Sequence, residues 1–91
     1  MATNYSVTTG VGTNATLVVP GASGRNFLII QNVGTATAYF AQDANVTTSA
    51  YAFTLFPQGQ MNLSGPQTYG GPWYACTASS TTSISYGDCV Q

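Results

Sequence analysis

The sequence predicts an all-β protein: a single small antiparallel β-sandwich or jelly-roll-like barrel of about eight short strands, with no significant helix. Short runs of Thr, Val, Tyr, Ile and Phe, which favour strands, alternate with clusters of Gly, Pro and Asn. These turn signals recur about every 8–12 residues, as they do in sandwiches and small barrels. No window carries the apolar period of an amphipathic helix, and the chain has no Glu and no Lys, which are common on helix surfaces.

Each predicted strand is an apolar or β-branched run that ends at a turn signal. The first run, residues 5–9, is the weakest, and residues 88–91 either extend the last strand or form a tail. Residues 64–72 are rich in Gly and Pro and predict a loop, and residues 77–83 predict a polar hairpin tip. We expect the strands at residues 5–9, 15–19, 26–31, 36–41, 52–55, 60–63, 73–77 and 83–86.

The third predicted strand is apolar on both faces. Leu28 and Ile30 point to one side of it, and Phe27 and Ile29 point to the other. A strand with two apolar faces needs a second layer on each side. In a sandwich one layer is the partner sheet, so the other must be a loop, a terminal arm or another subunit.

The length of 91 residues predicts one domain, residues 1–91, in which residues 1–14 form an N-terminal arm. The N-terminal sequence lacks the basic region and apolar core of a signal peptide. No apolar run approaches the ~20 residues that a membrane span needs. We therefore expect a soluble chain that does not enter the secretory route by its own signal.

The near absence of charge excludes several classes of function. Charged residues make up 3% of the chain, against about a quarter of a typical soluble protein. One cation is too few to neutralise the phosphates of a nucleic acid or to bind an anionic membrane, so neither is an expected partner. A net charge near zero favours association, and we expect a homo-oligomer or a piece of a larger assembly.

The sequence contains few of the residue types that catalysis requires. A nucleophilic Ser needs a base, and the chain has no His and no Lys. Asp43 and Asp88 are expected to close turns rather than to form a carboxylate dyad. Without His and without a CxxC pair there is no metal site, and no Gly-rich phosphate loop precedes a helix. We therefore expect no enzyme activity, no catalytic residues, no cofactor and no metal.

Two cysteines, Cys76 and Cys89, leave two readings open. A disulfide would require the strands to bring their Cα atoms within ~7 Å of each other. The alternative, which we favour, is a pair of reduced cysteines in or near the core.

Arg25 and the aromatic residues are the candidates for binding. Arg25 is either an anchor in an interface or the partner of a carbonyl cluster or an Asp in its own subunit. Tyr69, Trp73 and Tyr74 cluster around two glycines, either as core or interface residues or as a platform that stacks on sugar rings. A carbohydrate-binding module is therefore the alternative function. One Thr-Ala-Thr triplet is too little for an ice-binding face.

The segment GRNFLIIQNVGTATAYFA resembles a recurrent module of small structural proteins in tailed-phage virions. FTLFPQGQ and GGPWYACTAS follow in the order of that module, so the resemblance covers roughly residues 23–88. It implies a capsid decoration (cement) protein, or a related head or tail accessory protein, with a jelly-roll-like sandwich that commonly forms trimers. The low charge and the two cysteines depart from the pattern.

The resemblance implies a function in assembly. The protein would bind the outside of a phage capsid, bridge neighbouring major capsid subunits and assemble in the host cytoplasm. Its partners would be the major capsid protein and further copies of itself. We expect the N-terminal arm and the segment from Tyr69 to Trp73 to make these contacts, so that deletion of residues 2–12 abolishes shell binding but leaves a folded core. The candidate interface residues are Tyr5, Arg25, Phe27, Ile29, Tyr69, Trp73 and Tyr74.

Overall fold

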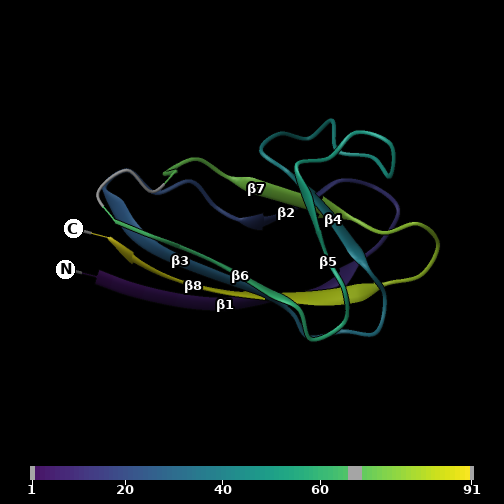
Figure 1. The fold of residues 1–91 in the computed structure, drawn as a ribbon, viewed down its shortest axis with the longest axis horizontal. Coiled ribbons are helices and arrows are strands. Elements are labelled where there is room, and N and C mark those ends of the chain that lie inside the picture. The colour runs from purple at the N-terminus through teal and green to yellow at the C-terminus, as the bar shows by residue number, and fades with distance from the viewer. Residues whose placement is uncertain (1, 66–68, 91) are drawn as a thin grey trace.

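The computed structural model describes residues 2–65 and 69–90, which form eight strands and no helix. Two four-stranded antiparallel sheets stack as a sandwich (Figure 1), so the predicted fold class is confirmed. None of the described residues form a helix that is long and apolar enough to cross a membrane. The strands are β1 (Ala2–Val11), β2 (Thr16–Val19), β3 (Arg25–Asn32), β4 (Ala38–Ala41), β5 (Phe53–Leu55), β6 (Gln60–Ser64), β7 (Trp73–Cys76) and β8 (Thr82–Val90).

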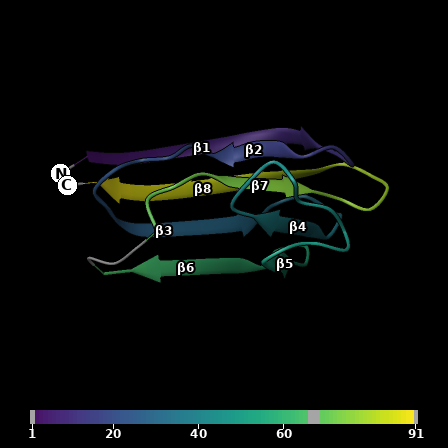
Figure 2. The ribbon, with the colours of Figure 1, turned by 90° about the horizontal axis from the view of Figure 1, so that it is seen from above.

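The two sheets differ in length. The first sheet has the order β1-β8-β3-β6 and holds the three longest strands, of 10, 9 and 8 residues. The second sheet has the order β2-β7-β4-β5, and its strands have 3 or 4 residues. Seen from above, the short second sheet covers only one end of the first (Figure 2).

The N-terminal segment is a strand of the first sheet, so the expected arm at residues 1–14 is wrong. β1 pairs with β8 from Ala2 to Val11, and the register shifts once, between Thr8 and Val11. Gly10 lies in this bulge with a φ of 70°, a conformation that glycine adopts without steric cost. The N-terminal segment is uncharged, and its backbone pairs with a strand that is distant in sequence.

The core lies between the sheets and combines aliphatic side chains with packed aromatic rings. Phe40 and Phe53 stack with their centroids 4.8 Å apart, and Phe53 meets Trp73 edge-on at 5.1 Å. The buried aliphatic side chains come from both sheets, as the alternating pattern requires. The buried cluster contains Val11, Val18, Val19, Leu28, Ile30, Ala38, Phe40, Leu55, Trp73, Ala75 and Ile84.

A buried amide ties the two sheets together at the end of β3. Asn32 Nδ2 donates to the carbonyl oxygens of Ala36 at 2.7 Å and Leu55 at 2.9 Å. Asn32 Oδ1 accepts from Gly34 N at 3.1 Å and from Thr82 Oγ1 at 2.7 Å. These four bonds satisfy the amide fully, which is what a buried polar side chain requires. The turn predicted at residues 32–34 is therefore held from both sheets.

The loop between β4 and β5 covers part of the outer face of the second sheet. Val46 in this loop is buried, and the Cys76 thiol on β7 lies 3.9 Å from its carbonyl oxygen. Tyr51 packs edge-on against Tyr39 of β4, with their ring centroids 5.1 Å apart. The second sheet therefore has cover on both faces over β4 and β7.

Candidate interaction surface

The outer face of the first sheet carries exposed apolar side chains over three neighbouring strands. Tyr5 and Val7 on β1 are 79% and 57% exposed, and Phe27 on β3 is 36% exposed. Ile29 lies on the same face of β3, half-buried. The cross-strand register aligns Tyr5 with Gly87 of β8, and Gly87 with Ile29. We call the surface formed by Tyr5, Val7, Phe27, Ile29 and Gly87 the bare face.

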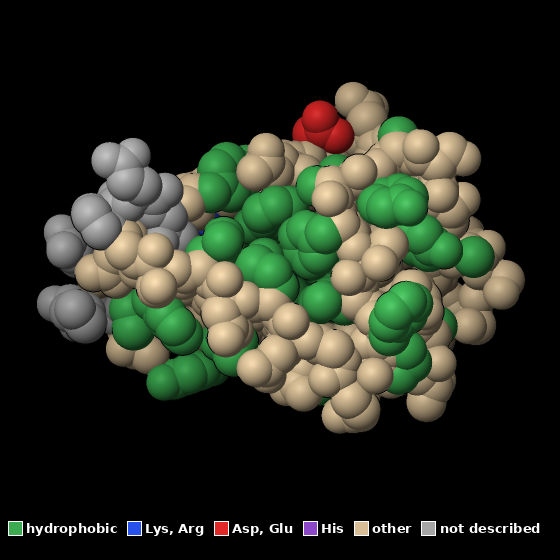
Figure 3. All heavy atoms as spheres, in the orientation of Figure 1, with side chains coloured by type: hydrophobic (Ala, Val, Ile, Leu, Met, Phe, Trp, Pro, Cys, Tyr) green, Lys and Arg blue, Asp and Glu red, His purple; other side chains and the backbone are tan. Residues whose placement is uncertain are grey.

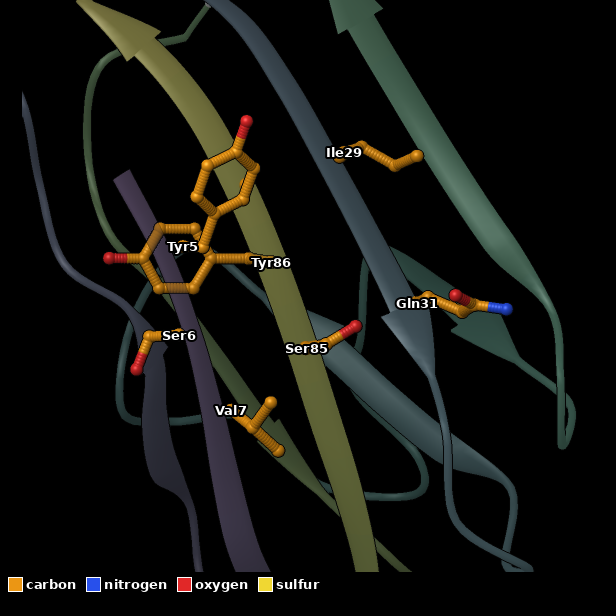
Figure 4. A pocket seen from close by; sticks show the side chains of 8 residues that line it. Tyr5, Ser6, Val7, Ile29, Gln31, Ser85 and Tyr86 are labelled. Carbon is orange, nitrogen blue, oxygen red and sulfur yellow. The ribbon is translucent and has the colours of Figure 1, made fainter. Parts of the chain in front are cut away.

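Gly87 allows the Tyr5 ring to lie against the sheet. A Cβ atom at Gly87 would come 3.0 Å from Tyr5 Cδ1 and 3.5 Å from Ile29 Cγ2. The ring therefore occupies the space above the glycine, where it shields backbone that has no side chain of its own. Figure 4 shows Tyr5 and Ile29 on either side of β8.

A shallow groove of about 400 Å³ runs along this face. Its walls combine apolar groups with hydroxyl and amide groups, and none of its lining residues is charged. Such a lining suits an uncharged partner. Binding to it should depend little on salt concentration, because the groove has no charges for salt to screen. The groove is lined by Tyr5, Ser6, Val7, Ile29, Gln31, Ser85, Tyr86 and Gly87 (Figure 4).

No described part of the chain covers the bare face. The N-terminal segment lies beside β8 as a strand and not over β3. The β4–β5 loop packs on the other sheet, against Tyr39 and Cys76. Of the three covers expected from the sequence, neither the N-terminal segment nor the β4–β5 loop lies over this face.

Arg25 is buried inside the subunit, so the expectation of an exposed interface anchor is wrong. Its Nε donates to Asp88 Oδ2 at 3.0 Å, and its side chain is 0% exposed. The other guanidinium nitrogens donate to carbonyl oxygens at 2.6 Å (Pro20), 3.0 Å (Gly71) and 3.2 Å (Tyr69). The structure thus shows the second reading of the sequence, in which the lone cation binds an Asp and a carbonyl cluster of its own chain.

Asp43 and Asp88 differ from each other in role. Asp43 Oδ1 accepts from Asn45 N at 3.0 Å and so closes a turn, as expected. Asp88 lies within β8, not in a turn, and also accepts from Asn4 Nδ2 at 3.0 Å. Its turn assignment was wrong because the Tyr-Gly-Asp sequence resembles a turn while the long-range pairing extends the strand.

The three aromatic residues proposed for sugar stacking do not share an exposed face. Trp73 is 5% exposed and belongs to the core. Tyr69 packs edge-on against it with the centroids 5.5 Å apart. Tyr74 is half-buried and alternates to the opposite side of β7. Part of the adjoining predicted loop, residues 66–68, lies outside the described residues.

The cysteines are free thiols on different sheets, Cys76 on β7 and Cys89 on β8. Cys76 is buried, and burial raises the pKa of its thiol. Among the described residues there is no group of three or more His, Cys, Asp or Glu side chains that could hold a metal ion.

Sequence reasoning placed Tyr5, Phe27 and Ile29 among the interface candidates, and the structure brings these three onto one face. It missed Val7 and Gly87, which complete that face. The alternation of Tyr5 and Val7 was a signal for the first, but nothing local places a β8 glycine beside Tyr5.

No protein-family model matches the sequence, and no curated protein sequence matches it significantly. Solved structures of other proteins share its fold. A Cupin_2 domain of an XRE family transcriptional regulator from Enterobacter cloacae has a TM-score of 0.64 and 9% identity, covering 98% of this chain and 82% of that one. PirA has a TM-score of 0.57 and 13% identity, covering 93% of each chain. The SPBc2 prophage-derived protein YomS has a TM-score of 0.53 and 6% identity, covering 97% of this chain and 95% of that one.

These identities show a shared β-sandwich, jelly-roll-like fold alone. The three neighbours have unrelated descriptions, so the fold does not select a function.

Proposed function

We propose that this chain is a structural accessory protein of a tailed-phage virion, which binds the capsid surface and bridges neighbouring major capsid subunits. The observation that carries the proposal is the bare face, an uncharged apolar surface that no described part of the chain covers. Exposed apolar patches on small proteins commonly mark sites of protein–protein contact. The proposed activity is binding, without catalysis.

The size of the bare face fits a weak contact that becomes strong when several copies bind together. A strand of 10 residues is about 34 Å long, and three strands are about 10–14 Å wide, so the bare face offers roughly 400 Å². A stable standard interface buries about 800 Å² on each partner. One copy therefore binds modestly, and tight decoration depends on several linked contacts through effective concentration.

One solved structure with this fold also supports the proposal. YomS is described as prophage-derived, so this fold occurs in a protein that a prophage encodes. The resemblance of the segment from Gly24 to Ala41 to virion structural proteins is the other support. The alternative, a carbohydrate-binding module, loses support because Tyr69, Trp73 and Tyr74 form no common exposed platform.

The test is binding to purified capsid shells of the phage whose genome encodes this chain. The double substitution Tyr5→Ser and Val7→Thr keeps β-compatible residues but removes apolar area from the bare face. Burial of such a side chain contributes about 1.5–3 kcal/mol, so we expect the affinity for shells to fall at least about tenfold. Co-sedimentation of labelled protein with shells over a concentration series measures it.

Tyr51→Ser is the matched control, because Tyr51 is 49% exposed but packs on the outer side of the other sheet. It should leave shell affinity unchanged. Equal binding by the double variant and the original chain, with both folded by circular dichroism, would overturn the proposal. Binding should also change little between low and moderate salt, since the face carries no charge.

A further inference from the structure

The free edge of β6 is a second surface that the bare face does not use. β6 pairs with β3 on one side and, among the described residues, with no strand on the other. Figure 2 shows β6 and β5 along the same side of the molecule. Figure 3 shows apolar side chains gathered on this side. Met61 and Leu63 of β6 and Phe53 of β5 are half-buried there, packed against the core.

The edge of β6 has no bulge, register shift, charge or Pro along its whole length, whereas β1 is free of them only from Ala2 to Thr8. β1 has a bulge at Gly10, and β2 has a register shift and ends before Pro20. β5 has only 3 residues. β6 pairs with β3 in continuous register over five residue pairs and contains no charge and no Pro. A flat uncharged edge of this kind is a template for another strand.

The sequence of β6 is complementary to itself in an antiparallel pair. If two copies meet on a twofold axis at Asn62, Gln60 lies opposite Ser64 and Met61 opposite Leu63 of the other copy. The side chains alternate correctly in this register, since Gln60, Asn62 and Ser64 are exposed while Met61 and Leu63 face the core.

We propose that a second copy of this chain pairs its β6 with β6 of the first, antiparallel and centred on Asn62. The two four-stranded sheets then form one continuous eight-stranded sheet. Each Met61 packs beside a Leu63, and this covers apolar area that a single copy leaves half-exposed. Because β6 carries no charge, the twofold axis brings no like charges together.

This pairing deepens the proposed function, because it names the surface by which the structural protein contacts itself. It gives a dimer instead of the trimer that the resemblance implies. A twofold contact uses the same patch on both copies and closes the assembly at two. The bare faces of both copies remain free for other partners, since they lie on the face of the sheet and not on its edge.

In the proposed register, Asn62 is the one residue of β6 that lies opposite the same residue of the other copy. The test uses this property. In Asn62→Lys two ammonium groups face each other, and in Asn62→Asp two carboxylates do. Each variant alone should dimerise about fivefold more weakly than the original chain at low ionic strength, and an equal mixture of the two should recover dimer as the mixed pair. Sedimentation equilibrium over a concentration series measures all three.

Asn45→Lys and Asn45→Asp are the matched controls, because Asn45 is exposed in the β4–β5 loop and takes the same changes of charge. They should dimerise as the original chain does. The proposal is overturned if the original chain is monomeric or trimeric throughout the series, or if the Asn62 variants match the Asn45 variants.

Cysteine trapping gives an independent measurement in a Cys89→Ser background, which removes the half-exposed thiol. Asn62→Cys should form a covalent dimer on mild oxidation, because paired Cα atoms lie about 4.5–5.5 Å apart. Ser64→Cys is equally exposed and on the same strand, but its two copies are separated by four residue positions along the strands, about 13 Å, and should not crosslink. Equal crosslinking of both variants would overturn the register.

The two proposals can be tested independently, because different substitutions are expected to affect shell binding and dimerisation. Tyr5→Ser with Val7→Thr should lose shell binding and keep the dimer. Asn62→Lys and Asn62→Asp should each lose the dimer. Because Asn62 lies opposite Ile29 on the outer face, their shell binding is compared with that of their equal mixture, which restores the dimer.

Discussion

At the scale of single residues, the one cation of the chain serves the fold. Arg25 and Asp88 are 63 residues apart in sequence, and their ion pair joins the start of β3 to the end of β8. The hydrogen bonds from Arg25 to three carbonyl groups also hold the chain near Pro20 and the segment from Tyr69 to Gly71. Removal of one partner from such a buried pair leaves an uncompensated charge.

Asp88→Asn should therefore lower the free energy of unfolding by about 3–5 kcal/mol, because the buried Arg25 guanidinium loses its counter-charge. Asp43→Asn is the matched control, since Asp43 is exposed and its turn tolerates Asn; it should change stability by less than about 0.5 kcal/mol. Urea denaturation of the three proteins measures the difference. Similar stability of the two variants would contradict the structural role of the ion pair.

At the scale of elements, β1 is part of the sandwich. Its Val11 is fully buried in the core, and its backbone pairs with β8 along most of its length. The end of β1 also lies near the other sheet, where Gly12 O, just after β1, accepts from Thr77 N, just after β7, at 2.8 Å. β1 therefore contributes both ladder bonds and core volume.

Deletion of residues 2–12 should abolish cooperative unfolding, in place of the folded core expected from the sequence. It removes one strand, opens a buried core position and exposes the edge of β8, in a domain whose total stability is about 5–15 kcal/mol. Thermal unfolding followed by circular dichroism, with Tyr5→Ser/Val7→Thr as the control that keeps the strand, measures the effect. A truncated chain that still unfolds cooperatively would show that the remaining seven strands suffice.

At the scale of the whole molecule, two partly or fully buried groups that are neutral when protonated give the protein a pH dependence on the alkaline side of neutrality. Burial raises the pKa of Cys76 above its ordinary 9.0. Burial, and secondly the negative charge of Asp88, raise the pKa of Tyr86 above its ordinary 10.0, while Arg25 acts in the opposite direction. Both groups are neutral when protonated, so the folded protein keeps protons that the unfolded chain releases.

The contribution of these two groups to stability should therefore be fully present below about pH 9 and be lost as the pH rises through their pKa values in the folded state. Cys76→Ala should reduce the loss of stability that begins near pH 9.0. Tyr86→Phe should reduce the loss that begins near pH 10.0. The free energy of unfolding in urea at a series of pH values from about 8 to 11 measures the slopes. A slope that both variants leave unchanged would assign the loss to other groups.

Local pattern in the sequence determined the all-β class, the eight strands and the neutrality of the surface, because alternation and turn chemistry act between near neighbours in the chain. It also predicted that Phe27 and Ile29 are covered from outside their own sheet. Only the tertiary structure decided which strands pair, and with that the length of β1, the burial of Arg25 by Asp88, and the meeting of Tyr5 with Gly87. Those contacts join residues more than 60 positions apart, and they are fixed by backbone pairing that no short stretch of sequence contains.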